Sequence, residues 1–282
     1  MKALIVNADD FGIHPDVNRA VLKAYQTGIL RSTSLMATGR AFAEAANLAH
    51  ENPALGVAVH VTLVAEKPVL DPKRIPSLVN AEGFFLPNHV AFIKRFLTGG
   101  IRLAELRAEI EAQIERVLQA EVHVTHLDSH QHLHVLPRVI DICLDLMQAY
   151  GIHKMRLPAE AYGFRGGYHA GMGRYLAKCG LTFCAQLAAR KAKRKGVIMP
   201  HAFFGMLAGG HMSLENLLPI LQALPEGTSE IMMHPGMNNT TLAMAYDWGY
   251  HWQQELAAIT SPIARQTIAT QGIRLISFKE LS

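Results

Sequence analysis

The sequence contains no apolar run that approaches the roughly 18 residues needed to span a bilayer. The N-terminus carries one lysine and a short apolar stretch, and it turns acidic at Asp9 and Asp10 instead of reaching a small-residue cleavage site. It therefore predicts a first strand and not a signal peptide. From these absences we expect a cytoplasmic protein.

Cysteine and charge are both scarce. Cys143, Cys179 and Cys184 are odd in number and have no CxxC spacing, which is typical of reduced thiols. Only 18% of the residues are charged and 50% are hydrophobic, so global disorder is excluded and a sizeable core is expected. No internal repeat or low-complexity linker interrupts the chain. We expect a single domain, residues 1–282, with long insertions that shape a substrate site.

Nucleic-acid signatures are missing as well. The net charge is +4, but much of it comes from the run Arg190–Lys195, and no RNP, zinc-finger or helix-turn-helix pattern accompanies that run. We therefore expect no nucleic-acid partner. A solvated loop or helix end is the usual interpretation of such a run, while peripheral contact with an anionic membrane surface remains an alternative. A homodimer also remains open.

Short apolar runs alternate with amphipathic segments along most of the chain. The apolar runs predict strands at residues 3–6, 32–36, 55–61, 122–127, 154–157, 229–234 and 273–277, and the amphipathic segments predict helices at residues 15–28, 41–51, 102–119, 137–150 and 214–224. Residues 62–87 are expected to form a long loop, and residues 159–210 an irregular region. This alternation predicts an α/β fold with a parallel sheet, either covered on both faces or closed into a barrel.

Four of the predicted strands end in titratable residues. The richest of these ends holds five of the fifteen histidines, His123, His126, His130, His132 and His134, with Asp128 among them. The other three ends carry Asp9 and Asp10, His60, and His234. Because active sites of such folds lie at the carboxyl ends of the strands, we expect these side chains to meet at one site.

Imidazole and carboxylate ligands at such a site suit zinc or another first-row divalent cation. Two neutral imidazoles and one carboxylate leave positions open for water and substrate. Adjacent side chains of an extended segment alternate in direction, so one of Asp9 and Asp10 can bind the metal while the other reaches the water. A histidine opposite could protonate a leaving amine. Together these parts describe the hydrolysis of an amide or ester.

Each part also has a simpler interpretation. The histidine cluster could be a surface loop, and Asp9 with Asp10 could form an Asx-turn before a helix. His60 could be a hydrogen-bonded core histidine, and His234, which precedes Pro235, could be a turn residue. On these interpretations, the titratable residues at all four strand ends would lie there by coincidence.

Four segments resemble the signature blocks of the YdjC-like carbohydrate deacetylases, which include chitooligosaccharide and hopanoid-linked N-acetylglucosamine deacetylases. They are Asn7-Ala-Asp-Asp-Phe-Gly12, Val59-His-Val-Thr-Leu63, Thr125-His-Leu-Asp-Ser-His-Gln-His-Leu-His134 and Glu230-Ile-Met-Met-His-Pro-Gly236. The resemblance implies a distorted (β/α) barrel, removal of an acetyl group from an N-acetylated sugar, and one divalent metal ion, Mg²⁺ or Zn²⁺. The segments Leu63–Leu70 and Ile75–Val79 look more like the hopanoid branch.

Carried over by motif position, the resemblance implies Asp10, His60 and His130 as metal ligands, Asp9 as catalytic base and His234 as general acid. His126, His132 and His134 are then expected to orient the ligands or to face the substrate. Arg156 is predicted on other grounds: a buried arginine is rare unless paired, so its guanidinium should orient a carboxylate such as Asp9 or Asp128.

Other functions remain to be distinguished. A chitooligosaccharide deacetylase is the alternative within the family, a metal-dependent phosphoesterase is an alternative enzyme, and a sugar- or metal-binding protein is the non-enzymatic alternative. Apolar side chains in the segments 62–87 and 162–211 predict a groove for a bulky or lipid-linked aglycone.

Overall fold

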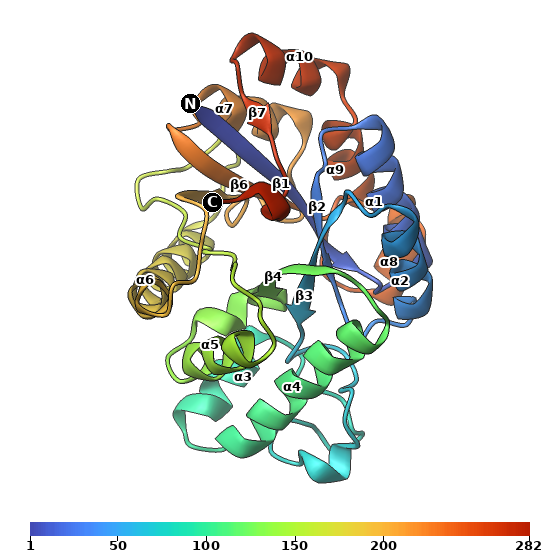
Figure 1. Ribbon diagram of the computed structural model, residues 1–282, viewed down its shortest axis with the longest axis vertical. Coiled ribbons are helices and arrows are strands. Elements are labelled where there is room, and N and C mark those ends of the chain that lie inside the picture. The colour runs from blue at the N-terminus through green and yellow to red at the C-terminus, as the bar shows by residue number, and fades with distance from the viewer.

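A curled sheet of parallel strands forms the centre of the computed structural model, which describes residues 1–282 (Figure 1). Six strands follow the order β4-β3-β2-β1-β6-β5, and β7 pairs with β1. Their bounds are β1 Lys2–Phe11, β2 Ser32–Leu35, β3 Gly56–Val61, β4 Val124–Ser129, β5 Ala202–Phe204, β6 Gly227–Met233 and β7 Arg274–Leu275. The expected α/β class and distorted barrel are confirmed.

An irregular segment narrows the opening of this barrel between β4 and β5. Met155 forms a parallel bridge with Leu127 of β4, and Lys154 forms one with Ile198. The Arg156 amide donates to the Leu127 carbonyl over 3.1 Å. The strand predicted at 154–157 is thus reduced to isolated bridges, because Pro158 follows at once and has no amide hydrogen to donate.

Helices surround the sheet (Figure 1). Their bounds are α1 Pro15–Thr27, α2 Phe42–Glu51, α3 His89–Leu97, α4 Leu103–Gln119, α5 Val139–Ala149, α6 Met172–Arg194, α7 Leu214–Gln222, α8 Asn239–Ala245, α9 Trp252–Ile259 and α10 Pro262–Thr270, with short 3-10 turns η1 Pro72–Arg74, η2 His130–Val135 and η3 Phe278–Glu280. The helices predicted at 15–28, 41–51, 102–119, 137–150 and 214–224 correspond to α1, α2, α4, α5 and α7.

Local sequence explains where α1 begins and ends. Pro15 occupies its first turn, where no amide donor is needed, and the His14 side chain accepts from the Asp16 amide. Gly28 ends the helix because a Cβ there would lie 2.6 Å from the Ala24 carbonyl oxygen and 2.7 Å from that of Ile259.

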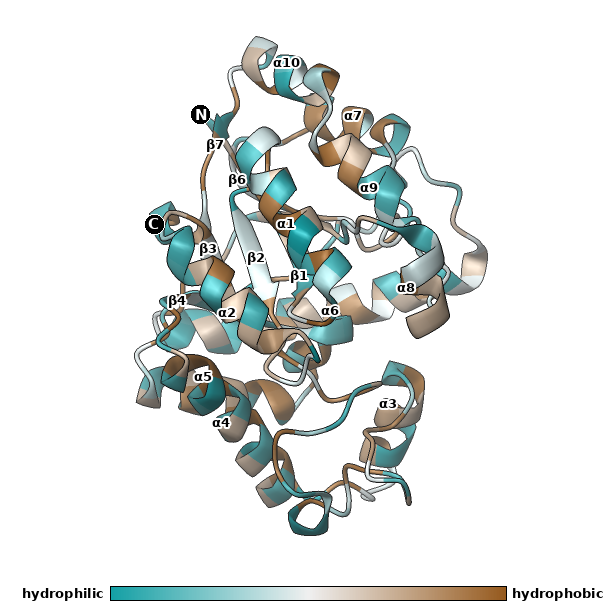
Figure 2. Ribbon diagram, turned by 90° about the vertical axis from the view of Figure 1, so that its right-hand side faces the viewer, coloured by the Kyte–Doolittle hydropathy of each residue, from teal (hydrophilic) through white to brown (hydrophobic).

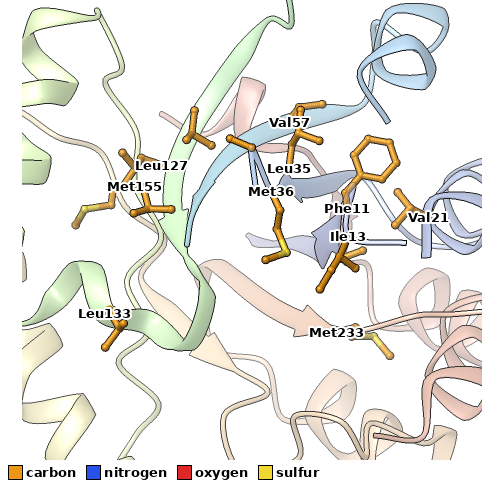
Figure 3. Packing of buried hydrophobic residues seen from close by; sticks show 14 of the residues in the cluster. Phe11, Ile13, Val21, Leu35, Met36, Val57, Leu127, Leu133, Met155 and Met233 are labelled. Atoms are coloured by element: carbon orange, nitrogen blue, oxygen red, sulfur yellow. The ribbon is translucent and has the colours of Figure 1, made fainter. Parts of the chain in front are cut away.

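Apolar side chains from the strands and the helices share one core of 70 buried residues. Phe11 and Ile13 lie beside Val21 of α1, and Leu127 lies beside Met155 (Figure 3). The strands are largely buried on both faces, as expected for a parallel sheet covered by helices. Core packing therefore fixes the positions of the strand ends.

The structure corrects the expectation of an irregular region at 159–210, since much of it is the 23-residue helix α6. The inner face of α6 presents small or polar residues, Lys178, Thr182, Ala185, Ala188 and Ala192, while Met172, Leu176, Phe183 and Leu187 are exposed. This inverts the usual amphipathic pattern. Periodicity of apolar residues therefore could not reveal this helix.

The basic run Arg190–Lys195 spans the end of α6. Two of its lysines form exposed ion pairs with α5, Lys191 with Asp141 at 2.7 Å and Lys195 with Asp145 at 2.5 Å. None of the helices combines the length and the apolar character that crossing a bilayer demands.

The loop predicted at 62–87 leads into α3, and this insertion extends away from the strands (Figure 2). Glu109 of α4 holds the start of the insertion, accepting from the amides of Val69 and Leu70 over 2.9 and 3.0 Å. Its carboxylate supplies partners that backbone amides in an irregular buried segment would otherwise lack.

Candidate active site

Asp9 and Asp10 lie at the end of β1, where the pairing with β2 is irregular between Ala8 and Phe11. Asp10 has a φ of 66°, in the left-handed region that non-glycine residues rarely adopt. Both carboxylates are buried. This backbone kink sends the two side chains to different partners, as the alternation of an extended segment predicted.

The Asp9 carboxylate is held by Arg156. Two bonds of 2.6 Å join the guanidinium nitrogens Nη1 and Nη2 to the two Asp9 oxygens. Arg156 has no exposed surface. The charge-assisted fork fixes the orientation of the carboxylate. The predicted pairing of Arg156 with a site carboxylate is therefore present.

Asp10, His60 and His130 bring one ligand atom each to a common point, with all three atoms within 4.8 Å of one another. Asp10 Oδ1 lies 3.0 Å from His130 Nδ1 and 3.6 Å from His60 Nε2. Two ligand atoms each about 2.1 Å from a zinc ion stand about 3.0 to 3.4 Å apart at angles between 90° and tetrahedral. Buried Asp10 Oδ2 and His60 Nε2 have no hydrogen-bond partner. The first spacing lies within this range, the second is about 0.2 Å longer than its upper end, and the unpaired atoms are of the types that bind a divalent cation.

A second set, Asp9, His60 and Asp128, also gathers within 4.8 Å. Its carboxylates are less available, because both Asp9 oxygens bind Arg156 and both Asp128 oxygens have partners, His60 Nδ1 at 2.7 Å and Ser34 Oγ at 2.6 Å. The first set is therefore the better candidate for the metal.

Electrostatics favour a cation at the same point. Three buried carboxylates, Asp9, Asp128 and Glu230, pair with the single buried arginine, Arg156, and the buried Asp10 adds a fourth negative charge beside His60 and His130. Burial opposes the charge of His60, but Asp128 and Asp10 raise the pKa of the ring to about 10. Burial likewise opposes ionisation of Asp10, but His130 and His60 hold its pKa well below the usual value. A divalent cation would supply the positive charge that a proton on His60 otherwise provides.

Asp128 orients His60. Its Oδ1 lies 2.7 Å from His60 Nδ1, which directs Nε2 of the ring toward Asp10. Ser34 Oγ donates to Asp128 Oδ2 over 2.6 Å and accepts from Asn7 Nδ2 over 2.7 Å. A carboxylate behind a ligating histidine fixes the tautomer and orientation of the ring and raises its basicity as a ligand.

Glu230 completes the surroundings of Arg156. It lies within β6, and its Oε1 accepts from Arg156 Nε over 2.8 Å. Burial raises the pKa of Glu230 to about 7, while the charge of Arg156 opposes that rise. Glu230 thus holds the side of the guanidinium that faces away from Asp9.

His234 follows β6 and lies near the same carboxylates. Its amide donates to Glu255 Oε2 of α9, and its ring Nδ1 lies 3.8 Å from the same oxygen. Burial opposes the charged ring, but Glu255 raises the pKa of His234, with smaller contributions from Asp10 and Asp9. A histidine held partly protonated beside the site can donate a proton.

Three histidines of the cluster are placed differently from expectation. His126 stacks on Phe278 with ring centroids 3.5 Å apart, and His132 packs edge-on against Phe203 at 5.6 Å. His134 lies 2.6 Å from Ser129 Oγ through Nδ1 and 3.2 Å from the Arg156 carbonyl oxygen through Nε2. These contacts connect η2 and β4 to the barrel wall and do not reach the three candidate ligands.

Sequence reasoning did not assign roles to Glu230, Ser34 or Glu255. A lone acid inside the buried strand Ser229-Glu-Ile-Met-Met-His234 is a usable signal for Glu230, because a buried carboxylate requires a partner. Ser34 and Glu255 carry no such signal, since a serine in a strand and a glutamate on a helix are ordinary.

Comparison with known proteins agrees with this geometry. The YdjC-like protein family matches residues 3–270. A carbohydrate deacetylase of Mus musculus is 33% identical, over 99% of this chain and 94% of the relative. One from Thermoanaerobacter pseudethanolicus is 31% identical over 100% of both chains. A solved structure from Enterococcus faecalis, named for cellobiose-phosphate cleavage, superposes with a TM-score of 0.79 at 25% identity, covering 99% of this chain and 98% of that one. The chain belongs to the YdjC-like family.

Proposed function

We propose that this protein is a metal-dependent hydrolase that removes the acetyl group from an N-acetylated sugar. The observation that carries the proposal is the joint burial, at one end of the sheet, of the Asp10–His60–His130 set and the arginine-held Asp9. The similar carbohydrate deacetylases supply the reaction class. Zinc and magnesium are the metals we consider first.

In this proposal Asp10, His60 and His130 hold the metal. When bound, a divalent cation lowers the pKa of a coordinated water to about 7 and polarises a carbonyl oxygen. Asp9, oriented by Arg156, accepts a proton from the attacking water. His234 donates a proton to the departing amine, so that the sugar leaves as a neutral amino sugar and the acyl group as acetic acid, which ionises to acetate on release.

The test is acetate release from N-acetylglucosamine, its β-1,4-linked dimer and a lipid-linked N-acetylglucosaminide. Each is assayed after chelation and again after addition of Zn²⁺, Mg²⁺, Co²⁺ or Mn²⁺. We expect acetate only in the presence of metal. Phosphate release from a generic ester without acetate release from any sugar would instead identify the chain as a phosphoesterase. Binding without turnover would support the non-enzymatic alternative.

The identity of the aglycone is a second question. The structure buries several side chains predicted to line an apolar groove, including Phe85, Leu86, Phe203 and Phe204. Exposed apolar side chains remain along α6, at Met172, Leu176, Phe183 and Leu187, of which Leu187 lies nearest the basic end of that helix. This surface favours a lipid-linked substrate over a chitooligosaccharide. Higher kcat/KM on the β-1,4-linked dimer than on the lipid-linked sugar would reverse that choice.

A further inference from the structure

Three aromatic residues alternate along the segment between α8 and α9. The ring centroid of Trp248 lies 4.9 Å from that of Tyr246 and 5.5 Å from that of Tyr250. Between them, Asp247 and Gly249 are exposed. These distances place the three rings in one continuous aromatic row.

This aromatic row lies beside both the candidate metal ligands and the candidate proton donor. Trp248 lies 5.1 Å from the candidate ligand His130, with the ring planes tilted by 39°. Tyr250 lies 4.8 Å from His234, the candidate proton donor. The aromatic row therefore lies against both a candidate metal ligand and the candidate proton donor.

The two tyrosines are fixed in place. The Tyr246 hydroxyl donates to the Ile13 carbonyl over 3.0 Å, and Tyr246 is only 6% exposed. Tyr250 packs over Gly210, where a Cβ would come within 2.3 Å of the ring. Its other neighbour, Trp252, is 2% exposed. A row held this firmly costs little conformational entropy when a ligand binds.

Trp248 and Tyr250 are partly buried, and Trp248 is the one whose ring lies beside the candidate ligand His130. An indole ring presents a large flat apolar surface with negative charge density on its face. A pyranose ring presents C–H groups on one face, which match that surface, and hydroxyls at its edge. Glu66, which is 6% exposed, and Arg40, whose guanidinium lies 5.8 Å from the Tyr246 ring, stand at the rim. The charges of Arg40, His130 and Asp10 all act on the Glu66 carboxylate, which places it beside the site.

We infer that Trp248 is the stacking surface for the sugar ring that bears the acetamido group. This inference rests on the proposed function for its choice of ligand. It assigns the binding of the sugar to the aromatic row and leaves the chemistry to the carboxylate and histidine residues. The substrate class that it predicts is a pyranose with an unobstructed C–H face next to the acetamido group.

The first experiment uses fluorescence, since Trp248 and Trp252 are the only two tryptophans. In the metal-loaded Trp252→Phe variant, saturating N-acetylglucosamine or its β-1,4-linked dimer should shift or quench the emission of Trp248. The matched Trp248→Phe variant, which reports from buried Trp252, should show no change. Calorimetry gives the sugar concentrations that saturate binding. The inference would be overturned if the emission of Trp248 is unchanged at those concentrations, or if neither sugar binds.

The second experiment uses kinetics. Trp248→Ala should raise KM for the N-acetylated sugar about ten-fold, with a smaller rise for Trp248→Phe, as expected for loss of an aromatic contact. Turnover of 4-nitrophenyl acetate, which has no sugar ring, should fall less than turnover of the N-acetylated sugar, and the metal should be retained. Equal losses on both substrates would contradict a stacking role. Failure of the wild type to release acetate from any sugar would contradict the proposed function, while the fluorescence experiment would still decide the role of Trp248.

Discussion

At the scale of single residues, the division of labour between Asp9 and Asp10 is the feature that most shapes the site. The left-handed φ of Asp10 turns its carboxylate toward His130, while Asp9 faces Arg156. We expect Asp9→Asn to retain the metal and to lose two to four orders of magnitude in kcat, about the usual contribution of positioned proton transfer. Elemental analysis and acetate release measure the two properties.

Asp10→Asn is the matched control, because it replaces a carboxylate by an amide at the neighbouring residue. It should lose metal and activity together. If Asp9→Asn is the variant that loses metal, the roles of the two aspartates are the reverse of those proposed.

Arg156 offers a separate test of how Asp9 is held. Lysine keeps the positive charge but cannot make the two parallel bonds of the guanidinium. Arg156→Lys should therefore lower kcat while leaving metal content and KM close to those of the wild type. Wild-type kcat in this variant would rule out orientation of Asp9 as the function of the fork.

Asp128 should act on the metal through His60. Replacing the carboxylate by an amide in Asp128→Asn weakens the fixation of the ring, and loss of such a partner typically costs about 10- to 100-fold in metal affinity. Competition with a chelator measures the affinity. His134→Gln is a suitable control, because His134 belongs to the same histidine-rich segment but bonds to Ser129 and to the Arg156 backbone. Equal losses in both variants would indicate general damage to the barrel wall.

At the scale of secondary structure, most strands were predictable, whereas β5 and α6 were not and the strand predicted at 154–157 is reduced to isolated bridges. A parallel strand covered on both faces leaves an uninterrupted apolar run, such as the one before Asp9, and this signal is local. The helix α6 buries a lysine whose ammonium group donates to the carbonyls of Ala161, Tyr162 and Phe164. No local pattern predicts a partner of this kind, since the carbonyls belong to a different segment.

Gly180 lies within α6, and a Cβ added there would meet nothing within 4 Å. Gly180→Ala should therefore stabilise the protein by about 0.5 to 1 kcal/mol, the cost of glycine in a helix interior. Gly39→Ala should destabilise it, because that Cβ would lie 2.1 Å from the Gly12 carbonyl oxygen. Urea unfolding of both variants gives the comparison. Destabilisation by Gly180→Ala would argue against the helix at this position.

At the scale of the whole molecule, the sequence could predict that the strand ends lie at one site. It could not predict which side chains there bond to one another. Asp10, His60 and His130 come from separate strand ends, and parallel topology alone brings such residues together. The connections of His60 to Asp128 and of Arg156 to Glu230 depend on the curvature of the sheet and on the irregular segment near β4. Those distances follow from the packing of the whole chain and have no counterpart in local sequence.

The C-terminal turn η3 is joined to β4 through His126, and this contact should make stability depend on pH. The ring stacks on Phe278, and burial lowers the pKa of His126 to about 3. His126 Nδ1 lies 2.8 Å from Thr125 Oγ1, and the buried Nε2 has no partner. A proton on Nε2 would therefore find no acceptor.

In the unfolded chain a histidine titrates near pH 6.5. Between pH 6.5 and 3, His126 carries a proton in the unfolded state but not in the folded state. The stability that neutral His126 contributes is therefore present above pH 6.5 and is lost as the pH falls toward 3. The slope is about 1.4 kcal/mol per pH unit.

His126→Phe keeps the stacking and removes the titrating group. At pH 5, 1.5 units below the unfolded pKa, the variant should have gained about 2 kcal/mol on the wild type, relative to their difference at pH 7.5. Urea unfolding of both proteins with a chelator at the two pH values measures this change and removes metal-linked effects. A difference in stability that does not change with pH would show that His126 accepts its proton in the folded protein.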